Sequence, residues 1–185
     1  NNKPYKETDA TFPINIYGKT KLAGEKSLLE LMPTNAVIIR SSRLYSEYGN
    51  NFVDTMLRLG KEQDYLNVVH HQNGCPTFAT DLAEVLLTII KSKKFYMKDR
   101  KTQIFHYSNK GKCSWYEFAK EIFIMAKIEC KVCPILPTEY LTQARRPKNT
   151  ELDKGKIARV FDSNLKPWRE SLMLCISLLE NKAIK

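Results

Sequence analysis

The chain has 185 residues, 43% of them hydrophobic and 27% charged, and its formal net charge is +10. These fractions are ordinary for a globular domain and exclude a fibrous or low-complexity chain. No apolar run approaches the roughly 20 residues that a membrane-spanning helix needs, so we expect no membrane partner.

Hydrophobic periodicity predicts alternating helices and strands along the chain. The expected helices are 15–32, 80–90, 115–127, 171–181 and one from Phe52 to about Lys61; the expected strands are 36–44, 65–70, 102–108 and 131–135. Asn51 and Thr80 are expected N-caps, and Ser114 with Glu117 forms a capping-box pattern. Alternation of this kind indicates an α/β fold with parallel strands and flanking helices.

In the helix that follows Thr80, one apolar stripe is expected to face the protein interior. Its members are Leu82, Val85, Leu86, Ile89 and Ile90. In the helix at 115–127, core spacing is found at Trp115, Phe118, Ile122 and Met125.

The positive charge is concentrated in part at 91–94 and 98–101, around a loop after a predicted helix. Single-strand binders pair basic stripes with aromatic ones, and no such pairing occurs here. We therefore interpret the charge as a solvated loop and predict no nucleic-acid partner.

Five cysteines, an odd number, argue against a complete disulfide framework and favour a reducing compartment, which indicates the cytoplasm. Cys130 and Cys133 form a lone C-x-x-C, and the adjacent His70 and His71 lack the spacing of metal ligands on a helix. No metal site is predicted, and nothing in the sequence indicates whether a divalent cation helps the protein.

Tyr17 and Lys21 lie four positions apart in the first predicted helix, so their side chains share a face. A nearby cation favours the ionised phenol, which suits a tyrosine to exchange a proton with a carbonyl or alcohol oxygen. The pair is typical of the acid/base half of a carbonyl reductase. Tyr116 and Lys120 repeat the spacing, but we interpret Tyr116 as an ordinary residue of a core-packed helix.

Several motifs accompany the Tyr17 pair in a fixed order along almost the whole chain. They are 4–9, 17–25, 37–42, 50–57, 72–77 with 81–83, and 146–153. With these motifs the chain resembles the extended short-chain dehydrogenase/reductases, and within them the dTDP-4-dehydrorhamnose reductases. The resemblance implies a Rossmann-like fold: residues 1–48 would end the cofactor domain, and residues 49–185 would form a small substrate-binding region with elements that return to the sheet.

Other parts of that family's pattern have no counterpart. The seven glycines form no G-x-G-x-x-G or G-x-x-G-x-x-G, the turn that holds a cofactor pyrophosphate. The family's catalytic Ser or Thr, upstream of the tyrosine, is also not found. We therefore expect the C-terminal part of a longer reductase, inactive by itself.

The resemblance also implies roles for individual residues. NADPH or NADH would reduce the C4 ketone of dTDP-4-keto-6-deoxy-L-mannose, with Tyr17 as proton donor and Lys21 on the nicotinamide ribose. Ser41 and Ser42, at the carboxyl end of a predicted parallel strand, would lie near the cofactor. Arg43 stands where these reductases typically carry a tryptophan that faces the sugar, so the exact sugar stays open.

Two further residues are candidates for substrate binding. Arg146, in the run 145–148, would grip the nucleotide diphosphate, because arginine offers a bidentate fork to phosphate oxygens. Asn51 would either contact the substrate or only cap its helix. A homodimer is the assembly that we retain for testing.

Two alternatives remain beside the rhamnose-forming reductase. The first is a reductase or 4-epimerase for another nucleotide sugar, which Arg43 keeps open. The second is a non-catalytic regulatory relative, like the beta subunit of methionine adenosyltransferase. Retention of both Tyr17 and Lys21 weighs mildly against the second alternative.

Overall fold

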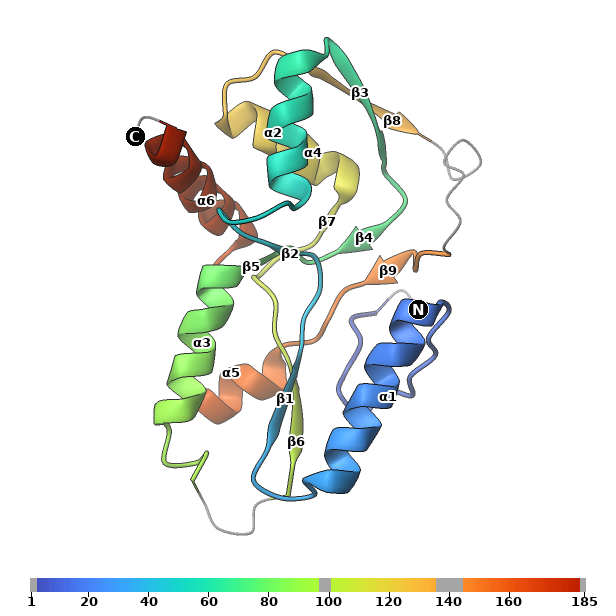
Figure 1. Cartoon of the computed structure of the whole chain (residues 1–185), viewed down its shortest axis with the longest axis vertical. Coiled ribbons are helices and arrows are strands. Elements are labelled where there is room, and N and C mark those ends of the chain that lie inside the picture. The colour runs from blue at the N-terminus through green and yellow to red at the C-terminus, as the bar shows by residue number, and fades with distance from the viewer. Residues whose placement is uncertain (1–2, 97–100, 136–144, 184–185) are drawn as a thin grey trace.

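Figure 1 shows a computed structural model of the chain, in which residues 3–96, 101–135 and 145–183 are described. The helices are α1 (Ile16–Leu31), α2 (Phe52–Glu62), α3 (Ala79–Lys91), α4 (Trp115–Met125), α5 (Gly155–Phe161) and α6 (Trp168–Ala183). The strands are β1 (Val37–Arg40), β2 (Leu44–Tyr45), β3 (Tyr65–Val69), β4 (Asn73–Gly74), β5 (Thr77–Phe78), β6 (Gln103–His106), β7 (Cys113–Ser114), β8 (Lys131–Ile135) and β9 (Asn149–Thr150).

Parallel pairing dominates, which confirms the predicted α/β class. β1 pairs with β6, β2 with β5, and β3 with β8, each in parallel. A small three-stranded sheet has the order β7-β4-β9, with β4 antiparallel to β7 and parallel to β9. None of the described helices is long and apolar enough to cross a bilayer.

The elements form two halves, each with its own core (Figure 1). In one half, α1 lies on one side of the β1–β6 pair and α3 with α5 on the other. Its buried core holds Val85, Ile89, Phe105, Tyr107, Ile157 and Phe161. In the other half, α2 and α4 pack beside β3 and β8, and α6 packs on α4, around a larger core that includes Phe78, Phe118, Ile122, Trp168 and Leu172.

Two of the expected helices keep their predicted N-caps, and the last helix does not keep its predicted start. The Asn51 side chain accepts hydrogen bonds from the N–H groups of Val53 and Asp54 at the start of α2. Ser114 and Glu117 form both bonds of a capping box on α4. The last helix starts at Trp168, three residues earlier than predicted, because its first turn packs into the core.

The prediction of Thr80 as an N-cap was wrong. The cap of α3 is Phe78, whose side chain makes no capping bond and is fully buried. Phe78 also ends β5, so α3 starts directly where that strand stops, and the tertiary pairing of β2 with β5 sets this point. Thr80 therefore lies inside the helix.

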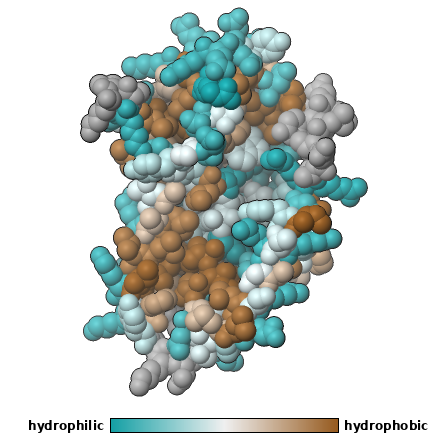
Figure 2. Space-filling view, in the orientation of Figure 1, coloured by the Kyte–Doolittle hydropathy of each residue, from teal (hydrophilic) through white to brown (hydrophobic). Residues whose placement is uncertain are grey.

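The predicted inner face of α3 was also partly wrong. Val85 and Ile89 are buried, but Leu86 and Ile90 are 38% and 46% exposed. Figure 2 shows hydrophobic side chains gathered on the half of the molecule that holds α3. The apolar stripe is thus wider than the surface that α5 and β6 cover.

The long strand predicted at 36–44 is shorter and interrupted. β1 stops at Arg40 and β2 begins at Leu44, with the intervening Arg43 at a φ of +49° in the left-handed region. The short strands β4, β5, β7 and β9 and the helix α5 were not predicted. Lys91 is the last residue of α3 and residues 92–94 follow it, close to the expected loop, whereas 98–100 lie outside the described residues.

Candidate active site

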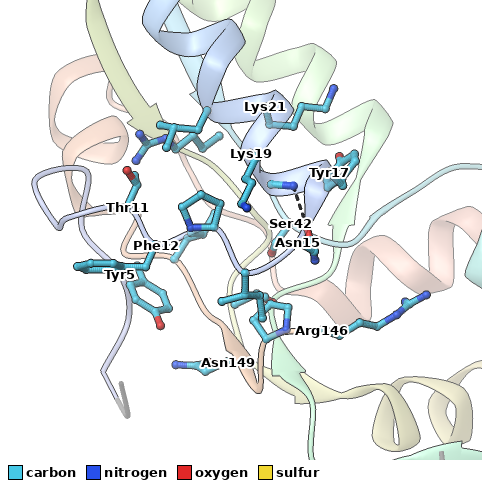
Figure 3. Close-up of a pocket in the computed structure, with 18 of the residues that line it drawn as sticks. Tyr5, Thr11, Phe12, Asn15, Tyr17, Lys19, Lys21, Ser42, Arg146 and Asn149 are labelled. Atoms are coloured by element: carbon cyan, nitrogen blue, oxygen red, sulfur yellow. Dashed lines mark hydrogen bonds between the residues drawn. The ribbon is translucent and has the colours of Figure 1, made fainter. Parts of the chain in front are cut away.

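A cavity of about 1150 Å³ opens beside the first turns of α1. Its walls come from the N-terminal segment, from α1, from the residues after β1, and from residues 145–152. Figure 3 shows Tyr17, Lys19, Ser42 and Arg146 around this space. The cavity therefore collects groups that are far apart in the sequence.

Tyr17 and Lys21 both line the cavity, on the same face of α1. The Lys21 ammonium lies 5.5 Å from the centroid of the Tyr17 ring. Tyr17 is 71% exposed, so its hydroxyl can be reached by a ligand. No ion pair to Lys21 is found within the described residues, which leaves its ammonium available to a bound molecule.

Asn15 fixes the start of α1 and ties it to the other wall of the cavity. Its Oδ1 accepts the Gly18 N–H at 2.8 Å, which is N-cap geometry. Its Nδ2 donates to the Arg145 carbonyl at 2.9 Å. A side chain at Gly18 would place its Cβ 3.1 Å from the Pro13 Cβ, so this turn packs closely.

A salt bridge holds α1 against β1. The Arg40 guanidinium donates from Nε and Nη2 to the two carboxylate oxygens of Glu25, at 2.8 and 2.6 Å. Both side chains are about four-fifths buried, and fork-to-fork pairs of this kind fix geometry as well as charge. The helix that carries Tyr17 is therefore oriented relative to the end of β1.

Ser41, Ser42 and Arg43 follow β1 and line the cavity, as the position of a parallel strand's carboxyl end predicts. The Ser42 hydroxyl donates to the Cys75 carbonyl at 2.7 Å, so its hydrogen is already used. Ser41 is exposed. Of the two serines, Ser41 keeps the freer hydroxyl.

His106 lies at the end of β6 with an exposed fraction of only 1% and also lines the cavity. Its Nδ1 is 3.0 Å from the Tyr5 carbonyl, which can only accept, so Nδ1 carries the hydrogen. Burial lowers the pKa of His106, while the nearby Glu7 carboxylate and the bond to Tyr5 oppose this shift. The neutral ring therefore presents Nε2, which has no partner within the described residues.

The lining is strongly basic. Seven basic and two acidic side chains line the cavity among the described residues, and the acidic Glu25 is paired with Arg40. Arg145 and Arg146 are exposed at its rim. An anionic ligand is thus favoured electrostatically.

The structure brings together six of the seven candidate residues. Tyr17, Lys21, Ser41, Ser42, Arg43 and Arg146 all line the cavity. Asn51 does not: its Oδ1 caps α2 and its Nδ2 donates to the Ser46 carbonyl at 2.7 Å. Its side chain serves the helix cap.

A family model described as the RmlD substrate binding domain matches residues 1–181. The chain belongs to this family. A dTDP-4-dehydrorhamnose reductase of Sinorhizobium fredii is 42% identical over 185 residues, covering 97% of the chain and 62% of the relative.

Two solved structures extend the family comparison. A dTDP-4-dehydrorhamnose reductase of Clostridium acetobutylicum is 40% identical, with a TM-score of 0.88 over 97% of this chain and 61% of its own. The enzyme of Bacillus anthracis, solved with NADP, is 38% identical, with a TM-score of 0.82 over 95% of this chain and 59% of its own. The chain thus spans about three fifths of the length of these RmlD relatives.

Several lining residues of this RmlD domain were not predicted from the sequence. Asn15, Tyr5 and His106 were not singled out, and Trp115 was assigned to the core alone. Asn15, immediately before an apolar-periodic helix, carried a readable N-cap signal. His106 carried none, because only the pairing of Arg40 with His106 across β1 and β6 brings it to the cavity. Within the described residues, no cluster of three or more His, Cys, Asp or Glu could hold a metal ion.

Proposed function

We propose that this chain is the substrate-binding part of an NAD(P)H-dependent reductase that converts dTDP-4-keto-6-deoxy-L-mannose into dTDP-L-rhamnose. The observation that carries the proposal is the Tyr17–Lys21 pair at a basic cavity. The names of the Sinorhizobium and Clostridium relatives support the same reaction.

Tyr17 is the proposed proton donor. As the C4 ketone is reduced, negative charge develops on its oxygen, and an exposed phenol in the cavity can deliver a proton there. The Lys21 ammonium stabilises the phenolate that remains, because the two side chains share a face of α1. The α1 N-cap and the Glu25–Arg40 pair hold the donor in place.

A reduced nicotinamide, when bound, would supply the hydride. The Lys21 ammonium makes no ion pair within the described residues and lines the cavity, so it can bind the nicotinamide ribose hydroxyls. Ser41 and Ser42 follow β1 at the position where such cofactors lie in α/β sheets. The NADP complex of the Bacillus anthracis enzyme supports this cofactor class. No Gly-rich pyrophosphate turn occurs in the sequence, so the cofactor assignment here is confined to the nicotinamide end.

Arg146, with Arg145, is proposed to hold the diphosphate of the nucleotide sugar. Both are exposed at the rim of the cavity, and the Arg145 backbone is anchored by Asn15. Guanidinium groups bind phosphate oxygens in a bidentate manner. Asn51 is left with its capping role.

The test uses the full-length gene product, with NADPH oxidation followed by absorbance in the presence of dTDP-4-keto-6-deoxy-L-mannose. Rapid oxidation that depends on the sugar nucleotide is the expected result. A folded protein that binds NADPH but shows no oxidation with this substrate would contradict the proposal. Such a result would favour the second candidate, a reductase or 4-epimerase for another nucleotide sugar, which Arg43 in the cavity wall supports.

The proposal includes the division at residue 48, a cytoplasmic location and a homodimer. The parallel pairing of β1 with β6 supports a region after residue 48 that returns a strand to the first sheet.

All five cysteines are free, which suits a reducing compartment. Exposed Leu86, Leu87 and Ile90 on α3 offer apolar surface to a second copy, and light scattering of the full-length protein would test the dimer.

A further inference from the structure

The Asn15 side chain connects the start of α1 to residues 145–147, which we call the arginine segment. Its Oδ1 accepts the Gly18 N–H at 2.8 Å, and its Nδ2 donates to the Arg145 carbonyl at 2.9 Å. These residues line the same cavity as Tyr17 (Figure 3). A primary amide has both an acceptor and donors, so one side chain can serve two segments that are far apart in the sequence.

The first turn of α1 depends on this cap. Tyr17 is the second residue of α1 and lies inside the turn that Asn15 closes. None of the residues of α1 is buried, so core packing does not fix this turn. The Glu25–Arg40 pair holds the helix about two turns further along. The placement of the Tyr17 phenol therefore depends locally on Asn15.

The arginine segment depends on the same amide. Between described residues, the bond from Asn15 to Arg145 is the one hydrogen bond found for residues 145–147. At the next position, the Lys148 carbonyl accepts the Asn73 N–H at 2.8 Å, just before β9. Arg145 and Arg146 are exposed, and neither forms an ion pair within the described residues.

Arg43, a further arginine of the cavity wall, is held in a different way. Its Nη1 donates to the Cys113 carbonyl at 2.8 Å, and its Nη2 donates to the Gln72 carbonyl at 2.6 Å. These two bonds clasp the guanidinium against the backbone. The side chains of the arginine segment are therefore better placed than Arg43 to move onto a bound anion.

We propose that Asn15 is a positioning residue that couples diphosphate binding at Arg145 and Arg146 to the placement of the Tyr17 proton donor. The proposal rests on the function proposed above and adds the link between its anion-binding groups and its acid. When the arginine segment closes on the diphosphate, the Asn15 bond carries the displacement to the first turn of α1. Binding energy from a part of the substrate that does not react then orients the acid, which raises turnover more than affinity.

The first test measures hydrogen exchange of the Gly18 amide in the full-length gene product, with and without dTDP. This ligand carries the diphosphate and lacks the hexose, so it probes the coupling without the reacting sugar. In the wild-type protein, dTDP is expected to slow the exchange by about fivefold or more. In Asn15→Ser, dTDP is expected to have no effect there, because serine keeps a cap acceptor but has no δ atom that reaches Arg145.

Steady-state kinetics separate positioning from a structural role. With NADPH and dTDP-4-keto-6-deoxy-L-mannose, Asn15→Ser is expected to lower kcat by about tenfold to a hundredfold and to change KM by about threefold at most. Asn51→Ser is the matched control, because Asn51 also caps a helix and donates from Nδ2 to a carbonyl, that of Ser46, but does not line the cavity. It is expected to keep the wild-type kcat and the wild-type response of Gly18 to dTDP.

A wild-type protein that binds dTDP with no change in Gly18 exchange would overturn the proposal, and this result needs no variant. Equal slowing in the wild-type protein and Asn15→Ser would also overturn it, as would a wild-type kcat in a folded Asn15→Ser protein. Failure of the wild-type protein to bind dTDP is a different result, because it would reject the diphosphate site of the proposed function itself.

Discussion

The two Tyr-x-x-x-Lys pairs of this chain have the same local geometry and different surroundings. In α1 the Lys21 ammonium is 5.5 Å from the Tyr17 ring centroid, and in α4 the Lys120 ammonium is 5.5 Å from that of Tyr116. Helix periodicity alone produces this distance. The distance therefore carries no information about function.

The surroundings separate the two helices. α1 has no buried residue and places Tyr17 at a cavity, whereas α4 buries Phe118, Ala119, Ile122 and Phe123 in the larger core. Tyr116 is partly buried against that core. In a helix with little buried surface, side chains remain available for contact with a ligand. In a helix that supplies the core, packing restricts the side chains.

The strongest test of this contrast removes one hydroxyl from each helix. In the full-length gene product, Tyr17→Phe is expected to lower turnover by about 10²–10⁴, because a general acid contributes that much. Tyr116→Phe, the matched control, is expected to keep near wild-type turnover. Steady-state NADPH oxidation measures both, and similar losses in the two variants would reject the contrast.

For stability, the expected order of the two helices is reversed, because a substitution in α4 should cost more unfolding free energy than one in α1. Phe118→Ala in α4 removes a fully buried ring that contacts Tyr45, Phe52 and Trp168, and should cost about 3–5 kcal/mol of unfolding free energy. The control is Leu31→Ala in α1, where the side chain is 81% exposed, and about 0.5 kcal/mol or less is expected. Urea unfolding followed by circular dichroism gives both values.

The two N-caps offer a smaller and sharper comparison. Asn15→Ala and Ser114→Ala should each cost about 1 kcal/mol, because each removes a side-chain acceptor for a helix N–H. Only Asn15→Ala should also weaken dTDP binding, because Asn15 holds the Arg145 carbonyl. Calorimetry with dTDP would show whether Ser114→Ala leaves that affinity unchanged.

The smallest expected effect is a pH dependence of folding stability that comes from His106 in the cavity wall. Because burial lowers the pKa of His106, the unfolded chain binds a proton more readily than the folded one. Stability should therefore be full above the unfolded pKa of about 6.5 and decline as the pH falls below it. His106→Gln should flatten this decline between roughly pH 7 and 5. The exposed His70→Gln is the control, and an equally steep decline in His106→Gln would contradict the assignment.

Much of the fold was readable from local patterns. The starts of α2 and α4 followed from Asn51 and the Ser114–Glu117 box, because capping is satisfied by residues within one turn. β3 and β8 were also found at or near their predicted positions. The two-residue strands β4, β5, β7 and β9 were not, since so short a run has no period of its own.

The candidate site likewise contains residues that local sequence patterns identify and residues that only the tertiary structure brings in. Tyr17 and Lys21 could be named from the sequence because helical spacing and the accompanying motifs lie on one continuous segment. Their catalytic role stays a prediction that the substitutions above will test. His106 and Trp115 reach the same cavity only through strand pairing and helix packing, which couple residues far apart in the chain.

The sequence by itself determined the α/β class, the family resemblance and the face shared by Tyr17 and Lys21, because these depend on short-range periodicity and on motif order. Only the tertiary structure decided which distant residues share a cavity with Tyr17 and Lys21, where α3 starts, and how Arg43 is held. Those outcomes depend on burial and on hydrogen bonds between distant segments, and neither is encoded in the spacing of nearby residues.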